Sequence, residues 1–127
     1  MELIKCEEKY WEDIRQLRNM DGVKQGFVKQ HHIKLREHRL FMQINNDCFY
    51  ACVDKEQFLG YTGVIDKDIR VATHPDHQKK GVASFMINEV MKIHPDAFAK
   101  VKVNNKASLR LFESCGFKKK YCILEKQ

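Results

Sequence analysis

The sequence predicts a single α+β domain over residues 1–127, built on a mostly antiparallel, mixed sheet of about six strands. Three observations support this prediction. The chain length suffices for one hydrophobic core but not for two. Hydrophobic residues make up 43% of the chain and charged residues 31%, which is typical of a folded protein. Apolar patterns with the periods of strands and of helices follow one another along the chain.

The N-terminal half is expected to form a strand followed by helices. Residues 2–6 are the expected first strand, and residues 7–19 carry apolar side chains at helical spacing. One or two short helices are expected between Asp21 and Asn46, because glycines indicate a break and apolar residues recur at helical intervals. The residues that carry this pattern are Gly22, Val23, Gly26, Phe27, Ile33, Leu40, Phe41 and Ile44.

The middle of the chain predicts three consecutive antiparallel strands. Residues 47–54 ("DCFYACVD") and 58–66 ("FLGYTGVID") are aromatic and β-branched runs separated by a polar turn. Residues 68–73 ("DIRVAT") follow a second tight turn. Both connections are short enough for hairpins, so the three strands are expected side by side.

The C-terminal half predicts alternating helices and strands. A helix is expected over residues 81–93, because apolar residues form one stripe and Pro95 follows as a stop. A strand over residues 98–103, a short helix over 106–116 and a last strand over 117–126 complete the fold.

Composition limits the partners and the location. The formal net charge of +6 suits an anionic small molecule or a weak nucleic-acid contact equally well. The five cysteines form no CxxC pair, and the N-terminus lacks the apolar core of a signal peptide, so a cytoplasmic location is expected. No apolar run approaches the roughly 20 residues that cross a bilayer. Histidine and cysteine spacings match no metal site, and no metal is expected.

The stretch "HPDHQKKGVA" at residues 74–83 has the features of an anion-binding loop. Pro75 ends the preceding strand, and the next helix is expected to begin near Gly81. The first turn of a helix leaves about four amide donors unpaired and carries about half a positive charge, which favours phosphate. An ordinary connecting loop with solvated lysines is the alternative. The chain contains neither G-x-G-x-x-G nor G-x-x-x-x-G-K-[ST], so neither a dinucleotide-binding turn nor a Walker-type loop is indicated.

Two spaced motifs resemble the GNAT family of acyl-CoA-dependent N-acetyltransferases. "QKKGVA" at residues 78–83 matches the family signature Q/R-x-x-G-x-G/A, and the lead-in "HPD" precedes it. "VNNKASLRLFESCGF" at residues 103–117 resembles the helix of that family that binds coenzyme A. The resemblance is clear over about residues 58–117, whereas the N-terminal half is only loosely similar.

The resemblance implies a GNAT fold with helices on both faces of the sheet and acetyl-CoA held where the fourth and fifth strands splay apart. The backbone of Ala72 and Thr73 would then bind the pantetheine arm, and Phe112 would pack against the cofactor. Ser84 is equally well explained as a helix-start residue. The remaining residues implied to bind the cofactor are Gln78, Lys79, Lys80, Gly81, Val82, Ala83, Ser84, Asn105 and Ser108.

The resemblance also implies a reaction with one expected group missing. Acetyl transfer to an amine needs a base, stabilisation of an oxyanion and a proton for the departing thiolate. Many family members donate that proton from a tyrosine, but Phe112 stands at the matching position, so Tyr121, ordered water or solvent is the expected source. Asp68 is the candidate base, and an exposed turn aspartate is the alternative.

The acceptor is expected to be a small amine. Residues 14–25 ("IRQLRNMDGVKQ") and 34–42 ("KLREHRLFM") resemble a subgroup that acetylates amino groups on nucleotide-linked sugars, and Arg18, Asn19 and His38 carry this likeness. Arg70, on the same strand face as Asp68, would join them in facing the acceptor. The alternatives are a solvated or ion-paired Arg18 and a solvated Arg70.

Other functions remain as alternatives at this level. A protein or peptide amine is the second acceptor class, and Phe112 also fits a non-catalytic acyl-CoA sensor. A nucleic-acid binder needs basic and aromatic residues together, which only residues 117–121 offer, so no nucleic-acid partner is expected. A homodimer is an expectation for the family as a whole.

Overall fold

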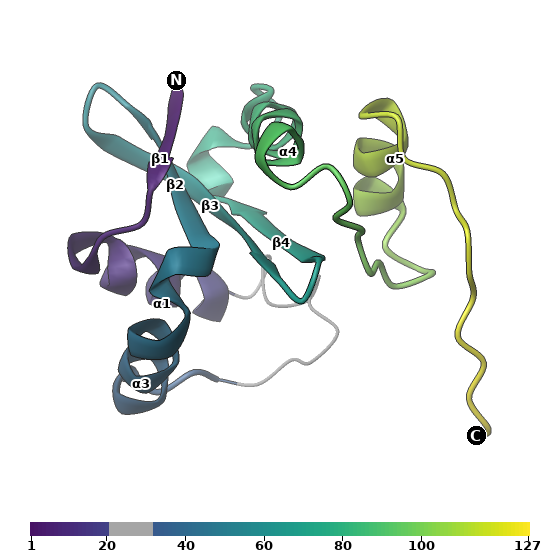
Figure 1. Ribbon diagram of the computed structural model, residues 1–127, viewed down its shortest axis with the longest axis horizontal. Helices are drawn as coiled ribbons and strands as arrows, with labels where there is room; N and C mark the ends of the chain where they lie inside the picture. Colours follow the sequence, from purple (N-terminus) through teal and green to yellow (C-terminus); the bar gives the residue numbers. More distant parts are fainter. Residues whose placement is uncertain (21–31) are drawn as a thin grey trace.

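The centre of the fold is an antiparallel sheet of four strands in the order β1-β2-β3-β4 (Figure 1). The computed structural model of the chain describes residues 1–20 and 32–127. Consecutive strands are neighbours throughout, as the short turns predicted. The strands are β1 (Glu2–Lys5), β2 (Phe49–Asp54), β3 (Gln57–Ile65) and β4 (Asp68–Thr73).

Two-residue turns connect the last three strands. Lys55 and Glu56 have φ values of 49° and 69°, and Asp66 and Lys67 have values of 52° and 68°. Positive φ at both central residues is the feature of type I′ hairpin turns, whose twist matches that of the strands they join. Both hairpins confirm the prediction of three consecutive antiparallel strands.

Helices cover both faces of the sheet, as predicted. Helices α1 (Trp11–Asn19) and α3 (Leu35–Asn45) pack on one face, and α4 (Val82–Ile93) packs on the other, with α5 (Lys106–Ser114) beside it. Each face has its own core. The buried core on the α1 side comprises Cys6, Tyr10, Trp11, Ile14, Leu17, Met42, Phe49, Ala51, Val53, Tyr61 and Ala72. On the α4 side the larger buried core comprises Tyr50, Val64, Ile69, Ile87, Val90, Ala97 and Phe112.

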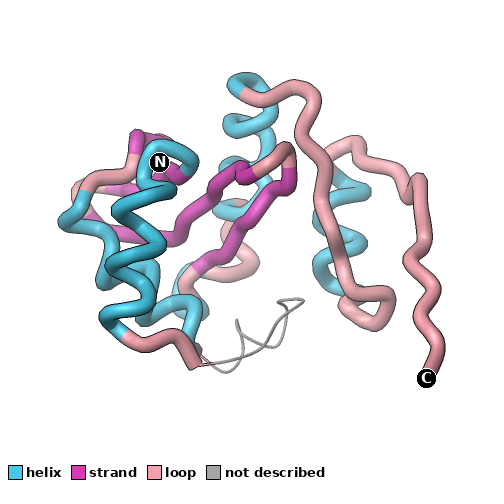
Figure 2. Tube along the Cα trace, turned by 60° about the horizontal axis from the view of Figure 1, so that its bottom comes forward, coloured by secondary structure: helices cyan, strands magenta, loops and turns pink. Residues whose placement is uncertain are grey.

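The predicted strand over residues 98–103 is wrong, apart from its first residue. Phe98 forms an isolated parallel bridge with Asp68. The amide of Ile69 donates to the Phe98 carbonyl, and the amide of Phe98 donates to the Lys67 carbonyl, both at 2.8 Å. Beyond this point the chain forms no ladder with β4 and runs between the sheet and α5 (Figure 2). The chain therefore leaves the edge of β4 directly after Phe98.

The predicted last strand over residues 117–126 is also wrong. This segment extends along the outside of α5 and has no strand beside it among the described residues (Figure 1). Tyr121, Ile123 and Leu124 are 85%, 80% and 92% exposed. The backbone groups of a β-strand are paired by hydrogen bonds with a neighbouring strand, so an apolar pattern alone does not produce a strand. The described sheet therefore has four strands instead of about six.

The remaining N-terminal predictions are confirmed in part. Residues 7–19 form a short 3₁₀ turn (Glu8–Tyr10) and helix α1, and the expected helical pattern around Leu40 falls in α3. The predictions for Gly22, Val23, Gly26 and Phe27 lie outside the described residues. None of the helices within residues 1–20 and 32–127 is long and apolar enough to cross a membrane.

Candidate functional site

The outer edge of β4 presents backbone groups that no strand receives. The outward amide of Ile69 reaches Phe98, so the period of two along a strand turns the groups of Val71 and Thr73 outward as well. Ala72 faces the other way, because a Cβ atom built on Gly60 would lie 2.5 Å from its carbonyl oxygen. The backbone groups of Ala72 therefore point into the sheet and do not suit the predicted cofactor contact, whereas those of Val71 and Thr73 point outward.

Hydrogen bonds hold the loop that follows β4 in place. The amide of His74 donates to the Leu59 carbonyl at 2.8 Å, and the Nδ1 atom of His74 accepts from the Asp76 amide at 3.1 Å. The side-chain amide of Gln78 donates to the Thr73 carbonyl at 3.3 Å. These bonds hold the 3₁₀ turn Pro75–His77 against the end of the strand. The predicted binding residue Gln78 thus fixes the loop from within.

The loop ends in an uncapped helix start. Gly81, the N-cap residue of α4, has a φ of +81°, and no side chain caps the helix. The first intrahelical bond runs from the Phe85 amide to the Gly81 carbonyl, so the amides of residues 82–84 have no helical acceptor. A Cβ atom at Gly81 would meet nothing within 4 Å. The open space and the unpaired donors make this point suited to an anion.

A buried hydroxyl lies at the same end of the strand. Thr73 is 8% exposed, and its Oγ1 atom has no hydrogen-bond partner among the described residues. Unpaired buried polar groups are uncommon because each one loses its bonds to water. The Thr73 hydroxyl therefore stands out at this end of the strand as a buried polar group without a partner among the described residues.

The second motif forms helix α5 as predicted. The Asn105 Oδ1 atom accepts from the Ser108 amide at 3.2 Å and caps the helix. Phe112 is buried, and its ring centre lies 5.1 Å from that of Phe117. Phe112 therefore fills the core between α5 and the sheet, and it brings no proton donor to this place.

Two arginines lie near Tyr61, on the face of the sheet that α1 covers. Arg70 and Asp68 lie on the face that α1 covers, and Arg18 stands in the last turn of α1. Burial raises the pKa of Tyr61 to about 12, whereas the charges of Arg18 and Arg70 act on the same hydroxyl in the opposite direction. The structure thus brings both predicted arginines to Tyr61. Sequence reasoning missed this tyrosine, although its alternation within β3 was a usable signal.

Asn19 and His38 do not join them. The amide of Ile33 donates to Asn19 Oδ1 at 2.8 Å, and Asn19 Nδ2 donates to the Ile33 carbonyl at 2.9 Å. His38 is 1% exposed and bonds to the Trp11 carbonyl. Both side chains therefore bond within the fold around α1, and their contact with an acceptor stays a prediction.

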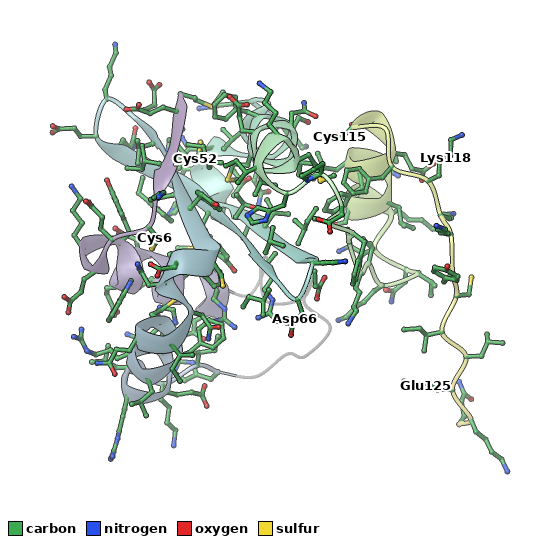
Figure 3. All side chains as sticks on the ribbon, viewed as in Figure 1. Cys6, Cys52, Asp66, Cys115, Lys118 and Glu125 are labelled. Atoms are coloured by element: carbon green, nitrogen blue, oxygen red, sulfur yellow. The ribbon has the colours of Figure 1, made fainter. Side chains whose placement is uncertain are left out.

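Tyr121 is not brought to the site either. It lies on the exposed C-terminal segment, where Lys120 Nζ stands 5.8 Å from its ring centre. Figure 3 labels Lys118 and Glu125 on the same segment, away from the sheet. The prediction that Tyr121 donates the proton therefore has no support in this structure.

The five cysteines lie on different parts of the fold. All five cysteines are free, and Cys6, Cys52 and Cys115 come from separate elements (Figure 3). Within the part of the chain that the structure describes, no three His, Cys, Asp or Glu side chains are placed to hold a metal ion.

Several solved structures with similar folds are described as acetyltransferases. A spermidine N-acetyltransferase from Vibrio cholerae, in complex with CoA and spermine, matches with a TM-score of 0.84 at 19% identity, over 98% of this chain and 85% of that one. A ribosomal-protein-alanine N-acetyltransferase from Brucella melitensis matches with a TM-score of 0.81 at 14% identity, over 93% and 85%. A putative acetyltransferase from Salmonella typhimurium, with its cofactor acetyl-CoA, matches with a TM-score of 0.76 at 16% identity, over 92% and 79%.

Sequence comparison identifies the family. The search of curated proteins gives no match. The family model "Acetyltransferase (GNAT) family" matches residues 11–117, which is most of the chain and includes both motifs. The chain therefore belongs to the GNAT family of acyl-CoA-dependent N-acetyltransferases, as those motifs predicted.

Proposed function

We propose that the protein transfers the acetyl group of acetyl-CoA to the primary amine of a small molecule, with amino sugars and nucleotide-linked amino sugars as favoured acceptors. The observation that carries this proposal is the uncapped start of α4 beside the open edge of β4. Because five cysteines are free, the proposal includes a reducing, cytoplasmic location.

The residues around this edge fit the cofactor. Acetyl-CoA supplies an activated acyl thioester when bound. The outward amide and carbonyl of Val71 and the outward amide of Thr73 would hold the pantetheine arm, and the Thr73 hydroxyl would gain the partner that it lacks. The amides of residues 79–84 would bind the pyrophosphate, with Lys79 and Lys80 adding positive charge. On the far side, the cofactor would be bordered by Asn105, Ser108 and Phe112 of α5 and its cap.

The proposed chemistry uses few side chains. Outward amides on β4 are placed to stabilise negative charge on a carbonyl oxygen, because they are fixed before any ligand arrives. Asp68 is the proposed base for the amine proton. Phe112 has no proton to donate and Tyr121 is exposed elsewhere, so water is the proposed proton source for the leaving group.

Calorimetric titration with acetyl-CoA tests the cofactor site. We expect micromolar binding by the parent protein and its loss in Gly81→Glu, whose carboxylate would meet the pyrophosphate. Gly116→Glu is the matched control, because Gly116 also has a positive φ, +94°, and open space around its Cβ position. Absence of binding to the parent protein would overturn the proposal.

A thiol-release assay with a panel of amines then separates an enzyme from a sensor. We expect release of free CoA that depends on an added amine. Binding of acetyl-CoA without release for any amine, including peptide amines, would favour the non-catalytic sensor.

A further inference from the structure

Arg18 and Arg70 approach Tyr61 from two different elements. Tyr61 pairs with Ala72 across β3 and β4, which makes Arg70, two residues earlier on β4, its diagonal neighbour on the same face. Arg18 comes from α1, which packs over that face. Both charges act on the Tyr61 hydroxyl, so both guanidinium groups lie within electrostatic reach of one point.

The rings of Phe41, Phe49 and Tyr61 form a continuous row beside Arg18, which we call the aromatic floor. The Arg18 guanidinium carbon is 5.3 Å from the ring centre of Phe41. The ring centres of Phe41 and Phe49 are 5.9 Å apart, as are those of Phe49 and Tyr61. Gly63, which pairs with Arg70, makes room for this row, because a Cβ atom there would lie 2.7 Å from the Phe49 ring. The floor offers no carboxylate to either arginine.

The two arginines also lack counter-ions elsewhere in the described residues. Arg15 pairs with Glu12 at 2.6 Å and Arg39 pairs with Glu8 at 2.8 Å, whereas no carboxylate within residues 1–20 and 32–127 approaches Arg18 or Arg70 to 4.0 Å. Both side chains are only partly exposed. Two guanidinium groups without an ion-pair partner within 4.0 Å among the described residues, one of them over the Phe41 ring, attract an anion and repel a cation.

We propose that Arg18 and Arg70 bind an anionic group of the acceptor, so that the preferred acceptors are amines that also carry a phosphate or carboxylate. This inference rests on the proposed N-acetyltransferase function and names the substrate class of that site. Guanidinium groups form bidentate hydrogen bonds with either kind of anion. Polyamines are disfavoured because each further ammonium group meets like charge.

Matched acceptor pairs test this specificity. Glucosamine 6-phosphate against glucosamine isolates the phosphate, lysine against cadaverine isolates the carboxylate, and spermidine represents the polyamines. For at least one pair we expect kcat/KM to be about tenfold or more higher for the anionic member, mainly through KM. Spermidine is expected to be the poorest acceptor. The pair with the larger ratio tells which anion the site prefers.

Two variants and a matched control connect the effect to these residues. Arg18→Gln and Arg70→Gln should each lower the preferred ratio by about tenfold and leave kcat/KM for the neutral member within about twofold. Arg36→Gln removes the same charge from an exposed position on α3 and should leave the ratio unchanged. The acetyl-CoA Kd and the circular dichroism spectrum should stay constant in all three variants.

The outcomes separate this inference from the function on which it rests. Acetyl-CoA binding together with equal or better use of neutral amines or spermidine would overturn the inference alone. A uniform loss for both members of a pair in the arginine variants would also overturn it. Failure to bind acetyl-CoA would overturn the function, and calorimetry with glucosamine 6-phosphate and with lysine would then test the arginines directly, with absence of binding to both counting against them.

Discussion

The Nε2 atom of His38 lies 2.7 Å from the carbonyl oxygen of Trp11 and joins α3 to the start of α1. Because a carbonyl only accepts hydrogen bonds, Nε2 carries the proton. The Nδ1 atom is buried and has no partner among the described residues. His38 therefore acts as a neutral clamp between two helices.

This clamp predicts a loss of stability in mild acid. Burial, with smaller contributions from Arg18 and Arg15, lowers the pKa of His38 below 6.5, although the Trp11 bond and Glu12 oppose the shift. In the unfolded chain the His38 imidazole binds a proton near pH 6.5, whereas in the folded chain it stays neutral at this pH. The contribution of neutral His38 to the free energy of unfolding is therefore present above pH 6.5 and is lost as the pH falls below it. The melting temperature should therefore drop between about pH 7.5 and about pH 5.5, and it should drop less in His38→Gln. Equal slopes in the two proteins would contradict the prediction.

Gly60 and Gly63 predict unequal effects of the same substitution. A Cβ atom at Gly60 would lie 2.5 Å from the Ala72 carbonyl oxygen, which is backbone and cannot move aside. At Gly63 the close atoms belong to the Phe49 ring, which can shift. We expect Gly60→Ala to lower the free energy of unfolding by about 3 kcal/mol and Gly63→Ala by about 1 kcal/mol, measured in urea. The reverse order would show that β3 and β4 are not packed as described.

Two buried threonines predict different effects on cofactor binding. Thr62 and Thr73 both have a buried Oγ1 atom without a partner among the described residues. Replacing each by valine should raise the free energy of unfolding of the unliganded protein by up to about 1 kcal/mol. Only Thr73→Val should weaken acetyl-CoA binding, by about fivefold, because Thr62 lies inside the sheet. Unchanged affinity in Thr73→Val would remove the proposed role of this hydroxyl.

The C-terminal segment predicts tolerance to truncation. Ending the chain after Lys118 keeps Phe117 on the Phe112 ring and removes only exposed residues. The melting temperature should change by less than about 2 °C, as measured by calorimetry. A fall of several degrees would mean that Ile123 or Leu124 is buried in solution.

Local patterns were sufficient for most of the fold. The apolar period predicted α4 and α5, and short polar turns predicted the β2-β3-β4 meander, because each of these signals is complete within a few residues. The strand predicted at residues 98–103 is absent because pairing ends after Phe98, and local pattern does not reveal where the chain leaves β4. The segment "YCIL" at residues 121–124 has strand propensity but no neighbouring strand.

The site was predictable where it depends on backbone and less so where it depends on tertiary contacts. Gly81 and the loop before it follow from a motif, and the structure gives them the expected helix start. The exact alternation along β4, which favours Val71 over Ala72, required the register with β3. Asn19 and His38 looked like ligand contacts by residue type, but their partners Ile33 and Trp11 are distant in sequence.

The open edge of β4 also has a consequence for self-association. An exposed strand edge is a template for pairing with another chain, which makes it an aggregation hazard. Here the chain after Phe98 runs past that edge without bonding to it, and Pro75 interrupts the backbone donors just beyond the end of the strand (Figure 2). The backbone groups that could bind an extended ligand are thus the same ones that could pair with a strand of another molecule, so a bound ligand would protect this edge.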